Sequence, residues 1–477
     1  MRRFGTWVSV GLAVAFMGIP GASAQDCLTS NPSFEVGDGL EGWTAFGDVR
    51  IVEILAVHGR HAVSIGGPDT GDWAISGVWQ AFAAEPGAVF DGVVRVGHAA
   101  GTPLTGLARG IVNVEWRDAA GELIDYDTFN VLTASHGVGR MRTHRFTAGP
   151  APEGTANARL LPAMLQSPAL ESGRVVFDLV DLIERTTPTY DEQQWGDFPT
   201  GRSLAFAGYD WRVKGSGVYG PGPNYFSHLP ESVDVVEGEL VMNQRFDGTR
   251  WTSAEVTLTD PLGYGDYVFT TRGDLGVLAP NTVLGLFLWQ YPACYDGRNL
   301  WNQHNEIDVE ISRWNDPDDD LAQFVIQPYD APGNIERFDI AYGPDETVSY
   351  AFEWLPGRID YRAWRGGPAD ESPATMIAEW TYAGQHLPRP EQPRVHINLW
   401  CVGEDGPSDA TPRTVIVSDF AFRGMGDVDR NGTIDFFDLL AFLGRLHAGD
   451  RRADVNNDGR FDAHDTALLI DTITGAW

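Results

Sequence analysis

The residues with the clearest chemical potential lie in the segment Asn305-Glu306-Ile307-Asp308-Val309-Glu310. Alternate side chains of a β-strand share a face, so Glu306, Asp308 and Glu310 are predicted to point to one side. Three like charges in a line repel one another, so fold stability alone does not favour this arrangement. The structural alternative is a solvated edge strand with an acidic outer face.

The spacing of the two glutamates suits a particular reaction. Four residues of strand span about 13 Å, and two side chains that each lean inward by roughly 4 Å leave their carboxylates about 5 Å apart. That separation is typical of a retaining glycosidase, in which one carboxylate is the nucleophile and the other the acid/base. The charge of Asp308 helps to keep one partner protonated near neutral pH. Spacing does not tell the two glutamates apart.

The segment also resembles the E-[IL]-D-x-E signature of glycoside hydrolase family 16, in the lichenase and xyloglucan-transferase branch. The resemblance implies that Glu306 is the nucleophile, Asp308 the modulating carboxylate and Glu310 the acid/base. It further implies a retaining endo-β-glycanase that hydrolyses a neutral polysaccharide, a β-glucan, without a catalytic cofactor. Two alternatives remain: a transglycosylase on a xyloglucan-like glycan, and a non-catalytic calcium-dependent glycan-binding protein.

Other segments of the same region extend this resemblance. Ser253-Ala254-Glu255 with Gly263-Tyr264-Gly265 is similar to the SGAE…YGYG stretch of lichenases, and Ser349–Trp354 and Ile397–Trp400 resemble two further strands of that family. One departure is that Val256-Thr257-Leu258 replaces the lichenase arginine after the contacting glutamate. Aromatic rings stack on sugars and amides bind hydroxyls. The expected substrate-binding residues are Trp289, Glu255, Gln327, Asn398 and Trp400.

The elements that must position these residues fall into three blocks. Residues 25–186 and 201–424 carry short alternating β-prone runs, which predict two β-sandwiches, and residues 187–200 read as a linker. The second sandwich is expected to be a concanavalin-like β-jelly-roll. From residue 425 to 477 the pattern becomes helical, which predicts a small separate module. The fold class is therefore mostly β with a helical tail.

The first block resembles the galactose-binding-like jelly-rolls that serve as carbohydrate-binding modules. The resemblance rests on Asn31-Pro32-Ser33-Phe34-Glu35, Gly42-Trp43 and Val176-Phe177-Asp178. It implies that a structural calcium ion could involve Glu35 and Asp178. The candidate sugar platforms are Trp43, Trp73 and Trp79.

Two loops near the end of the chain carry oxygen ligands at EF-hand spacing, with glycine at the sixth position. The first loop supplies Asp427, Asp429, Asn431, Thr433, Asp435 and Asp438. The second supplies Asp454, Asn456, Asp458, Arg460, Asp462 and Asp465, with the seventh position contributing its backbone carbonyl. The pattern predicts two Ca²⁺ sites and resembles a dockerin repeat, which implies a cohesin-bearing scaffold or cell-surface partner. A merely calcium-stabilised tail is the alternative.

Composition limits the possible partners and the location. The net charge of −32 disfavours nucleic acid and anionic membranes. Residues 1–24 have the pattern of an export signal, with Ala22-Ser23-Ala24 as its cleavage site. The protein is therefore expected to be secreted, or tethered at the cell surface, with no membrane insertion. Cys294 and Cys401 could form a disulfide or remain buried thiols.

Overall fold

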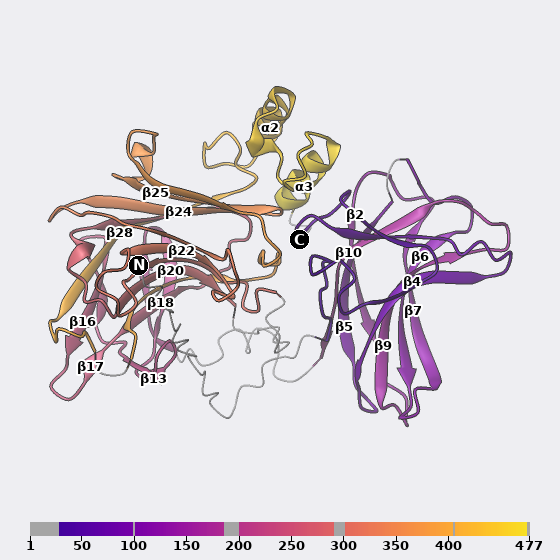
Figure 1. The fold of residues 1–477 in the computed structure, drawn as a ribbon, viewed down its shortest axis with the longest axis horizontal. Helices are drawn as coiled ribbons and strands as arrows, with labels where there is room; N and C mark the ends of the chain where they lie inside the picture. The colour runs from indigo at the N-terminus through magenta and orange to yellow at the C-terminus, as the bar shows by residue number, and fades with distance from the viewer. Residues whose placement is uncertain (1–27, 99–100, 186–199, 291–300, 404–405, 475–477) are drawn as a thin grey trace, which may run out of the picture.

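The computed structural model describes residues 28–98, 101–185, 200–290, 301–403 and 406–474. Two β-sandwiches are followed by a small helical module, which confirms the mostly-β fold class (Figure 1). The predicted export signal, residues 187–199 of the predicted linker, Cys27 and Cys294 lie outside the described residues. None of the described helices is both long and apolar enough to cross a lipid bilayer.

The first sandwich consists of two five-stranded antiparallel sheets around an apolar core. One sheet has the order β1 (Thr44–Phe46), β4 (Ala74–Ala83), β9 (Asn157–Gln166), β6 (Arg109–Arg117), β7 (Leu123–Thr133). The other has the order β2 (Val49–Val52), β3 (Ala62–Gly66), β10 (Arg174–Glu184), β5 (Phe90–Gly97), β8 (Arg142–Ala148). Alternation within the strands supplies the inward side chains, as predicted.

The second sandwich is larger and has two antiparallel sheets. The sheet that carries the acidic segment has the order β11 (Thr200–Phe206), β12 (Tyr209–Lys214), β18 (Ala254–Leu258), β27 (Arg394–Cys401), β20 (Thr282–Trp289), β21 (Ile307–Ile311), β22 (Ala322–Ile326), β23 (Ile335–Phe338). The opposing sheet has the order β15 (Val233–Val236), β16 (Glu239–Phe246), β28 (Arg413–Gly424), β19 (Gly265–Arg272), β24 (Thr347–Leu355), β25 (Arg358–Arg365), β26 (Met376–Tyr382).

The remaining elements are short. They are β13 (Gly217–Tyr219), β14 (Asn224–Phe226), β17 (Trp251–Thr252), the 3₁₀ turns η1 (Leu275–Val277), η2 (Pro368–Asp370) and η3 (Arg451–Ala453), and the helices α2 (Phe436–Ala448) and α3 (Ala463–Ile473). Both helices begin with a capping box, in which an aspartate at the N-cap and one at the third helical position bond each other's backbone amides.

The acidic strand β21 lies well inside its sheet. It pairs with β20 on one side and with β22 on the other. The solvated edge-strand alternative is therefore wrong, because the backbone of β21 is hydrogen-bonded along both sides. Its acidic face belongs to the broad outer surface of an eight-stranded sheet.

The helical module packs against both sandwiches, which its sequence pattern did not predict. Leu468 and Leu469 of α3 belong to one buried apolar cluster that also contains Ala56 and Val57 of the first sandwich and Trp354 of the second. Figure 1 shows α3 between the two sandwiches. Two short helices bury too little apolar surface by themselves, so the contact supplies the burial they need.

The loop 55–61, between β2 and β3, is the centre of this contact. The backbone amide of Gly59 donates to the carbonyl of Pro356 at 3.0 Å. The imidazole of His58 donates to the carbonyls of Leu387 at 3.0 Å and Pro388 at 3.1 Å. The loop therefore donates its hydrogen bonds to backbone carbonyl oxygens of the second sandwich, and no side chain of the second sandwich takes part in these bonds.

We predict that Leu468→Ala loosens this shared core. Leu468 is 1% exposed, and removal of a buried leucine side chain costs about 2–5 kcal/mol. Hydrogen–deuterium exchange followed by mass spectrometry should show faster exchange both in α3 and in the loop 55–61. Leu443→Ala, at a position that is 41% exposed, is the control and should change neither. Unchanged exchange of the loop in Leu468→Ala would contradict the shared core.

Candidate active site and calcium-binding loops

The strand β21 presents two chemically opposite faces. Ile307, Val309 and Ile311 are fully buried in the core of the second sandwich. The carboxylates of Asp308 and Glu310 therefore lie on the other face, as the alternation predicted, and Glu306 immediately precedes the strand. Asp308 is 2% exposed, whereas the two glutamates are half-buried.

Neighbouring side chains fix the start of the acidic segment. The amide side chain of Asn302 accepts the backbone N–H of Glu306 at 2.7 Å and donates to its carbonyl at 2.7 Å. Asn305 adopts a left-handed conformation with φ 50°, which asparagine tolerates better than most residues. Its carboxamide accepts the amide of Arg389 at 2.9 Å. The backbone that carries Glu306 is therefore held from two directions.

Cross-strand pairing brings several predicted residues into one row. In the register, Glu255 faces Asn398, Asn398 faces Gly285, Gly285 faces Glu310, and Glu310 faces Gln323. A Cβ atom at Gly285 would lie 2.5 Å from the Asn398 Oδ1 atom, so a larger residue there would displace the Asn398 carboxamide. Within the described residues this buried oxygen accepts no hydrogen bond. Asn398 thus offers an unused acceptor in the same row as Glu310, with Gly285 of β20 between them.

The three carboxylates strongly affect one another's protonation. Burial raises the pKa of Glu306 well above its usual value, and the charges of Asp308 and Glu310 raise it further. Burial likewise raises the pKa of Asp308, with the charge of Glu310 as the next cause. Burial raises the pKa of Glu310 to about 7, against the opposing effects of the Gln323 hydrogen bond and the Arg337 charge. The group therefore retains protons near neutral pH.

Two glutamines on β22 and just after it hold these carboxylates. Gln323 donates to Glu310 Oε2 at 2.6 Å, and Gln327 donates to Asp308 Oδ2 at 3.2 Å. The Gln327 carbonyl oxygen also accepts the amide of Tyr329 at 3.0 Å. Gln327 was predicted to bind substrate, and in this geometry its amide orients the middle carboxylate. Gln323 was not predicted, although its position directly opposite Glu310 follows from the strand pairing.

Glu255 is enclosed rather than presented to solvent. It is 3% exposed, and its two carboxylate oxygens bond Lys214 at 2.9 Å and His396 at 2.8 Å. Burial alone would raise its pKa, but the adjacent Lys214 and His396 hold it below the usual value. Lys214 also donates to the carbonyl of Gly220 at 2.7 Å. The predicted sugar contact of Glu255 thus lies in a buried ion pair, directly across from Asn398 in the same row.

The two predicted tryptophans differ in their surroundings. Trp289 is half-buried, and one face of its indole stacks on His304, with ring centroids 3.7 Å apart. Burial lowers the pKa of His304 to about 4, so this ring is neutral at physiological pH. Trp400 is 8% exposed and meets Trp314 edge-on at 5.9 Å. Trp289 therefore packs on a neutral imidazole beside the acidic segment, whereas Trp400 mainly supports the half-buried Trp314.

This arrangement is suited to acid/base and nucleophilic chemistry. It combines carboxylates that share protons, an aromatic ring and a buried amide acceptor on one face of one sheet. A protonated carboxyl can donate to a leaving oxygen while an ionised neighbour attacks or stabilises positive charge. Cys401, which follows Trp400, is a buried free thiol.

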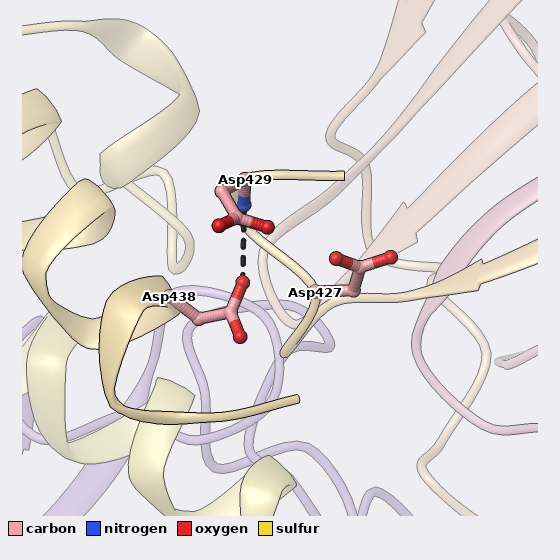
Figure 2. Close-up of side chains that lie close together, drawn as sticks. All are labelled: Asp427, Asp429 and Asp438. Carbon is pink, nitrogen blue, oxygen red and sulfur yellow. Dashed lines mark hydrogen bonds between the residues drawn. The ribbon is translucent and has the colours of Figure 1, made fainter. Parts of the chain in front are cut away.

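The first predicted calcium loop gathers its aspartates around one point. Oxygens of Asp427, Asp429 and Asp438 all lie within 4.8 Å of one another (Figure 2). Asp438 Oδ1 accepts the amide of Asp429 at 3.1 Å, and Gly432 turns the loop with φ 83°. Oxygen-rich donors around a turn at glycine fit Ca²⁺ better than a softer metal. Three of the six predicted ligands of this loop therefore gather around one point, and calcium coordination by all six stays a prediction.

The second loop repeats several hydrogen bonds of the first, although Asp465 accepts the amide of Val455 where Asp438 accepts that of Asp429. Asp454 accepts the amides of Asp458 at 3.0 Å and Gly459 at 3.1 Å, as Asp427 accepts those of the equivalent residues in the first loop. Asp465 accepts the amides of Val455 and Asp462, each at 3.0 Å. The two loops therefore share the turn around the first aspartate and the glycine, and a calcium ion in the second loop stays a prediction.

The predicted calcium ligands of the first sandwich take part in the loop contact. Asp178 accepts the amides of Val57 at 2.7 Å and His58 at 3.1 Å, and Glu35 accepts those of Arg60 at 2.9 Å and His61 at 2.6 Å. Burial, and then the charge of Glu35, raise the pKa of Asp178 well above its usual value. A calcium ion between them stays a prediction.

Of the three candidate sugar platforms in this sandwich, one is a core residue. Trp43 is 7% exposed, and its indole donates to the carbonyl of Asn31 at 2.9 Å. Trp79 is half-buried beneath the guanidinium of Arg159, which lies 3.8 Å from its ring centroid. Trp73 is 52% exposed. Only Trp73 and Trp79 are therefore accessible to a ligand.

Comparisons with known proteins give a family match for the end of the chain. Residues 425–474 match the family model described as the dockerin type I domain. No curated protein matches the chain.

Among solved structures, a β-glucanase of Bacillus licheniformis is similar at 17% identity and a TM-score of 0.32, over 48% of this chain and 95% of that one. A prokaryotic β-1,3-1,4-glucanase (lichenase) from a mouse hindgut metagenome is similar at 18% identity and a TM-score of 0.31, over 47% and 95%. An arabinose-bound α-L-arabinofuranosidase is similar at 10% identity and a TM-score of 0.27 over 34% of this chain, which spans only 27% of that chain's length.

We predict that Glu310→Gln stabilises the protein in a pH-dependent way. The folded-state pKa of Glu310 is raised to about 7, so folding favours its protonated form and the wild-type protein loses stability as pH rises from about 4.5 to 7. The neutral glutamine avoids this loss. Thermal unfolding at constant calcium should show an advantage of about 1 kcal/mol above pH 7, or about 2–4 °C, that vanishes near pH 4.5.

A control for this measurement lies on the same sheet. Glu336→Gln changes an exposed glutamate of β23 and should leave the pH dependence of unfolding as it is. An advantage of Glu310→Gln that stayed constant from pH 4.5 to 8 would contradict the raised pKa.

Removal of calcium is predicted to open the helical module. Without a cation the clustered carboxylates repel one another, and an ion that binds only the folded form adds stability by mass action. Limited trypsin digestion in EDTA should release fragments cut after Arg445, Arg451 or Arg452, and added calcium should suppress them. Asp438→Ala should be cut in calcium as well. Equal cleavage with and without calcium would contradict a calcium-dependent module.

Proposed function

We propose that the chain is a retaining endo-β-glycanase that hydrolyses O-glycosidic bonds of a neutral polysaccharide, a β-glucan. The observation that carries the proposal is the proton-sharing carboxylate group on the solvent face of an internal strand, next to an aromatic ring and an unused amide acceptor. Glycoside hydrolysis by double displacement needs such a group, because one carboxyl must give a proton while another attacks the sugar.

In this proposal the three acidic residues have distinct roles. Glu306 is the nucleophile that forms the glycosyl-enzyme, and Glu310, with its pKa raised to about 7, protonates the leaving oxygen and then activates water. Asp308 lies between them, held by Gln327 at 3.2 Å, and keeps a proton shared within the group. Asn398, whose buried side-chain oxygen accepts no hydrogen bond within the described residues, contributes to sugar binding.

The negative net charge of the protein is the reason for proposing a neutral substrate. A net charge of −32 repels sulfated or uronic polymers and lowers their local concentration. The half-buried Trp79 beneath Arg159 and the exposed Trp73 support glycan binding by the first sandwich. That sandwich would then hold a chain near the cleft, in the manner of a carbohydrate-binding module.

The helical module is proposed to bind Ca²⁺ at both loops and to tether the protein to a cohesin-bearing scaffold. The family match over residues 425–474 and the matching geometry of the two loops support this part. The predicted export signal is consistent with this role, because secretion would bring the protein to an extracellular scaffold and to its polysaccharide substrate.

Two variants and one control test the catalytic proposal. Glu306→Gln and Glu310→Gln should each retain less than about one hundredth of wild-type turnover, because each removes a covalent or proton-transfer step. Glu336→Gln should remain fully active. Reducing-end release from a panel of neutral polysaccharides measures turnover, and proton NMR of the fresh products should show the β-anomer first.

Each alternative has its own outcome in this assay. Early α-product, or a glutamine variant with more than about a tenth of the activity, would refute the assigned roles. Products longer than the substrate would indicate transglycosylation. Binding without turnover across the panel would favour a non-catalytic glycan-binding protein.

A further inference from the structure

The helices α2 and α3 of the helical module have equivalent faces that differ in their surroundings. Each half is a calcium loop followed by a helix, and the two align residue by residue through their shared hydrogen bonds. On one face of α2 lie Phe437, Leu440, Ala441 and Gly444. The equivalent residues of α3 are His464, Ala467, Leu468 and Asp471. In each helix these positions follow the spacing of a single stripe.

The stripe of α3 is covered by the first sandwich. The imidazole of His464 donates to the carbonyl of Ala56 at 2.8 Å. Asp471 is 3% exposed and forms an ion pair with Arg140, and Leu468 is buried in the shared core. This stripe therefore already has a protein partner, which is the loop end of a β-sandwich.

The corresponding stripe of α2 has no such cover. Phe437 is 64% exposed and Leu440 is 47% exposed, and they are flanked by Phe436 at 65% and Leu443 at 41%. We call Phe436, Phe437, Leu440 and Leu443 the α2 face. Figure 1 shows α2 at the outer edge of the molecule, beyond both sandwiches. Grouped exposed apolar side chains of this size mark a protein-interaction site on a soluble protein.

The α2 face is also uncharged in a strongly acidic protein. Between Phe436 and His447 the helix has two charged residues: Asp438, which is fully buried, and Arg445, which donates to the carbonyl of Val428 at 2.6 Å. Neither lies on the exposed stripe. With a net charge of −32 elsewhere, the face suits a partner surface that is apolar and nearly neutral rather than basic.

We propose that the two repeats of the helical module bind different partners. The α3 stripe is an internal clasp that holds the first sandwich, and the α2 face alone binds one cohesin-type β-sandwich module of a scaffold, in one orientation. The occupant is a β-sandwich because the equivalent stripe of the same chain already packs on one, through apolar contact and a backbone carbonyl. This inference rests on the tethering role proposed above.

The test uses the full chain in calcium and a panel of isolated type I cohesin modules. Calorimetric titration should give one module per chain. Phe437→Ser with Leu440→Ser should weaken binding at least about thirtyfold, as expected for central aromatic and aliphatic anchors. Phe461→Ser changes an exposed residue of the second loop, 39% exposed, and should bind within about twofold of wild type, as should His464→Ala.

Circular dichroism and thermal unfolding of each variant in calcium check that the module is folded. A loss of binding is then attributed to the changed α2 face and not to unfolding. No binding by the wild-type chain overturns the tether and this inference together. Tight binding by the Phe437→Ser, Leu440→Ser variant, or weakening by His464→Ala, overturns the inference alone. So does self-association of the chain that the double variant abolishes, because a second copy would then occupy the α2 face.

Discussion

The strict alternation of β21 is the constraint on which the candidate site depends. Its isoleucine and valine side chains are fully buried in the core of the second sandwich, and burial of each contributes about 1.5–3 kcal/mol. That anchoring offsets the cost of bringing carboxylates together on the opposite face, where burial and repulsion raise their pKa values. A slip of one residue would exchange the two faces, so pairing with β20 and β22 fixes the chemistry together with the fold.

Features that depend on local spacing could be predicted from the sequence. The face shared by Asp308 and Glu310 follows from a period of two, and the calcium loops follow from ligand spacing around a single glycine. Both helices follow directly on the two Asp/Asn-rich loops, where the helical pattern begins. Such features need no knowledge of strand order, because every interacting residue lies within a few positions of its partners.

Features that depend on the order of strands could not be predicted in this way. Lys214, Glu255 and His396 meet only because β12, β18 and β27 are neighbours in the sheet. The same holds for the edge-on contact of Trp400 with Trp314 and for the stacking of Trp289 on His304. The packing of α3 against two sandwiches was also missed, because an amphipathic pattern shows that a helix needs a partner without saying which one. The predicted substrate contacts therefore lie on the same face as the acidic strand, but their neighbours could not be predicted.

The clasp formed by α3 has a mechanical consequence. A protein held through a flexible linker swings freely about its anchor, and any pull is borne first by the linker. Here a load applied at α2 passes through α3 into the loop 55–61 and from there into both sandwiches, by way of the His464, Gly59 and His58 hydrogen bonds. An anchored molecule would therefore hold its acidic strand in a more nearly fixed direction than a linker allows, because α3 packs on both sandwiches.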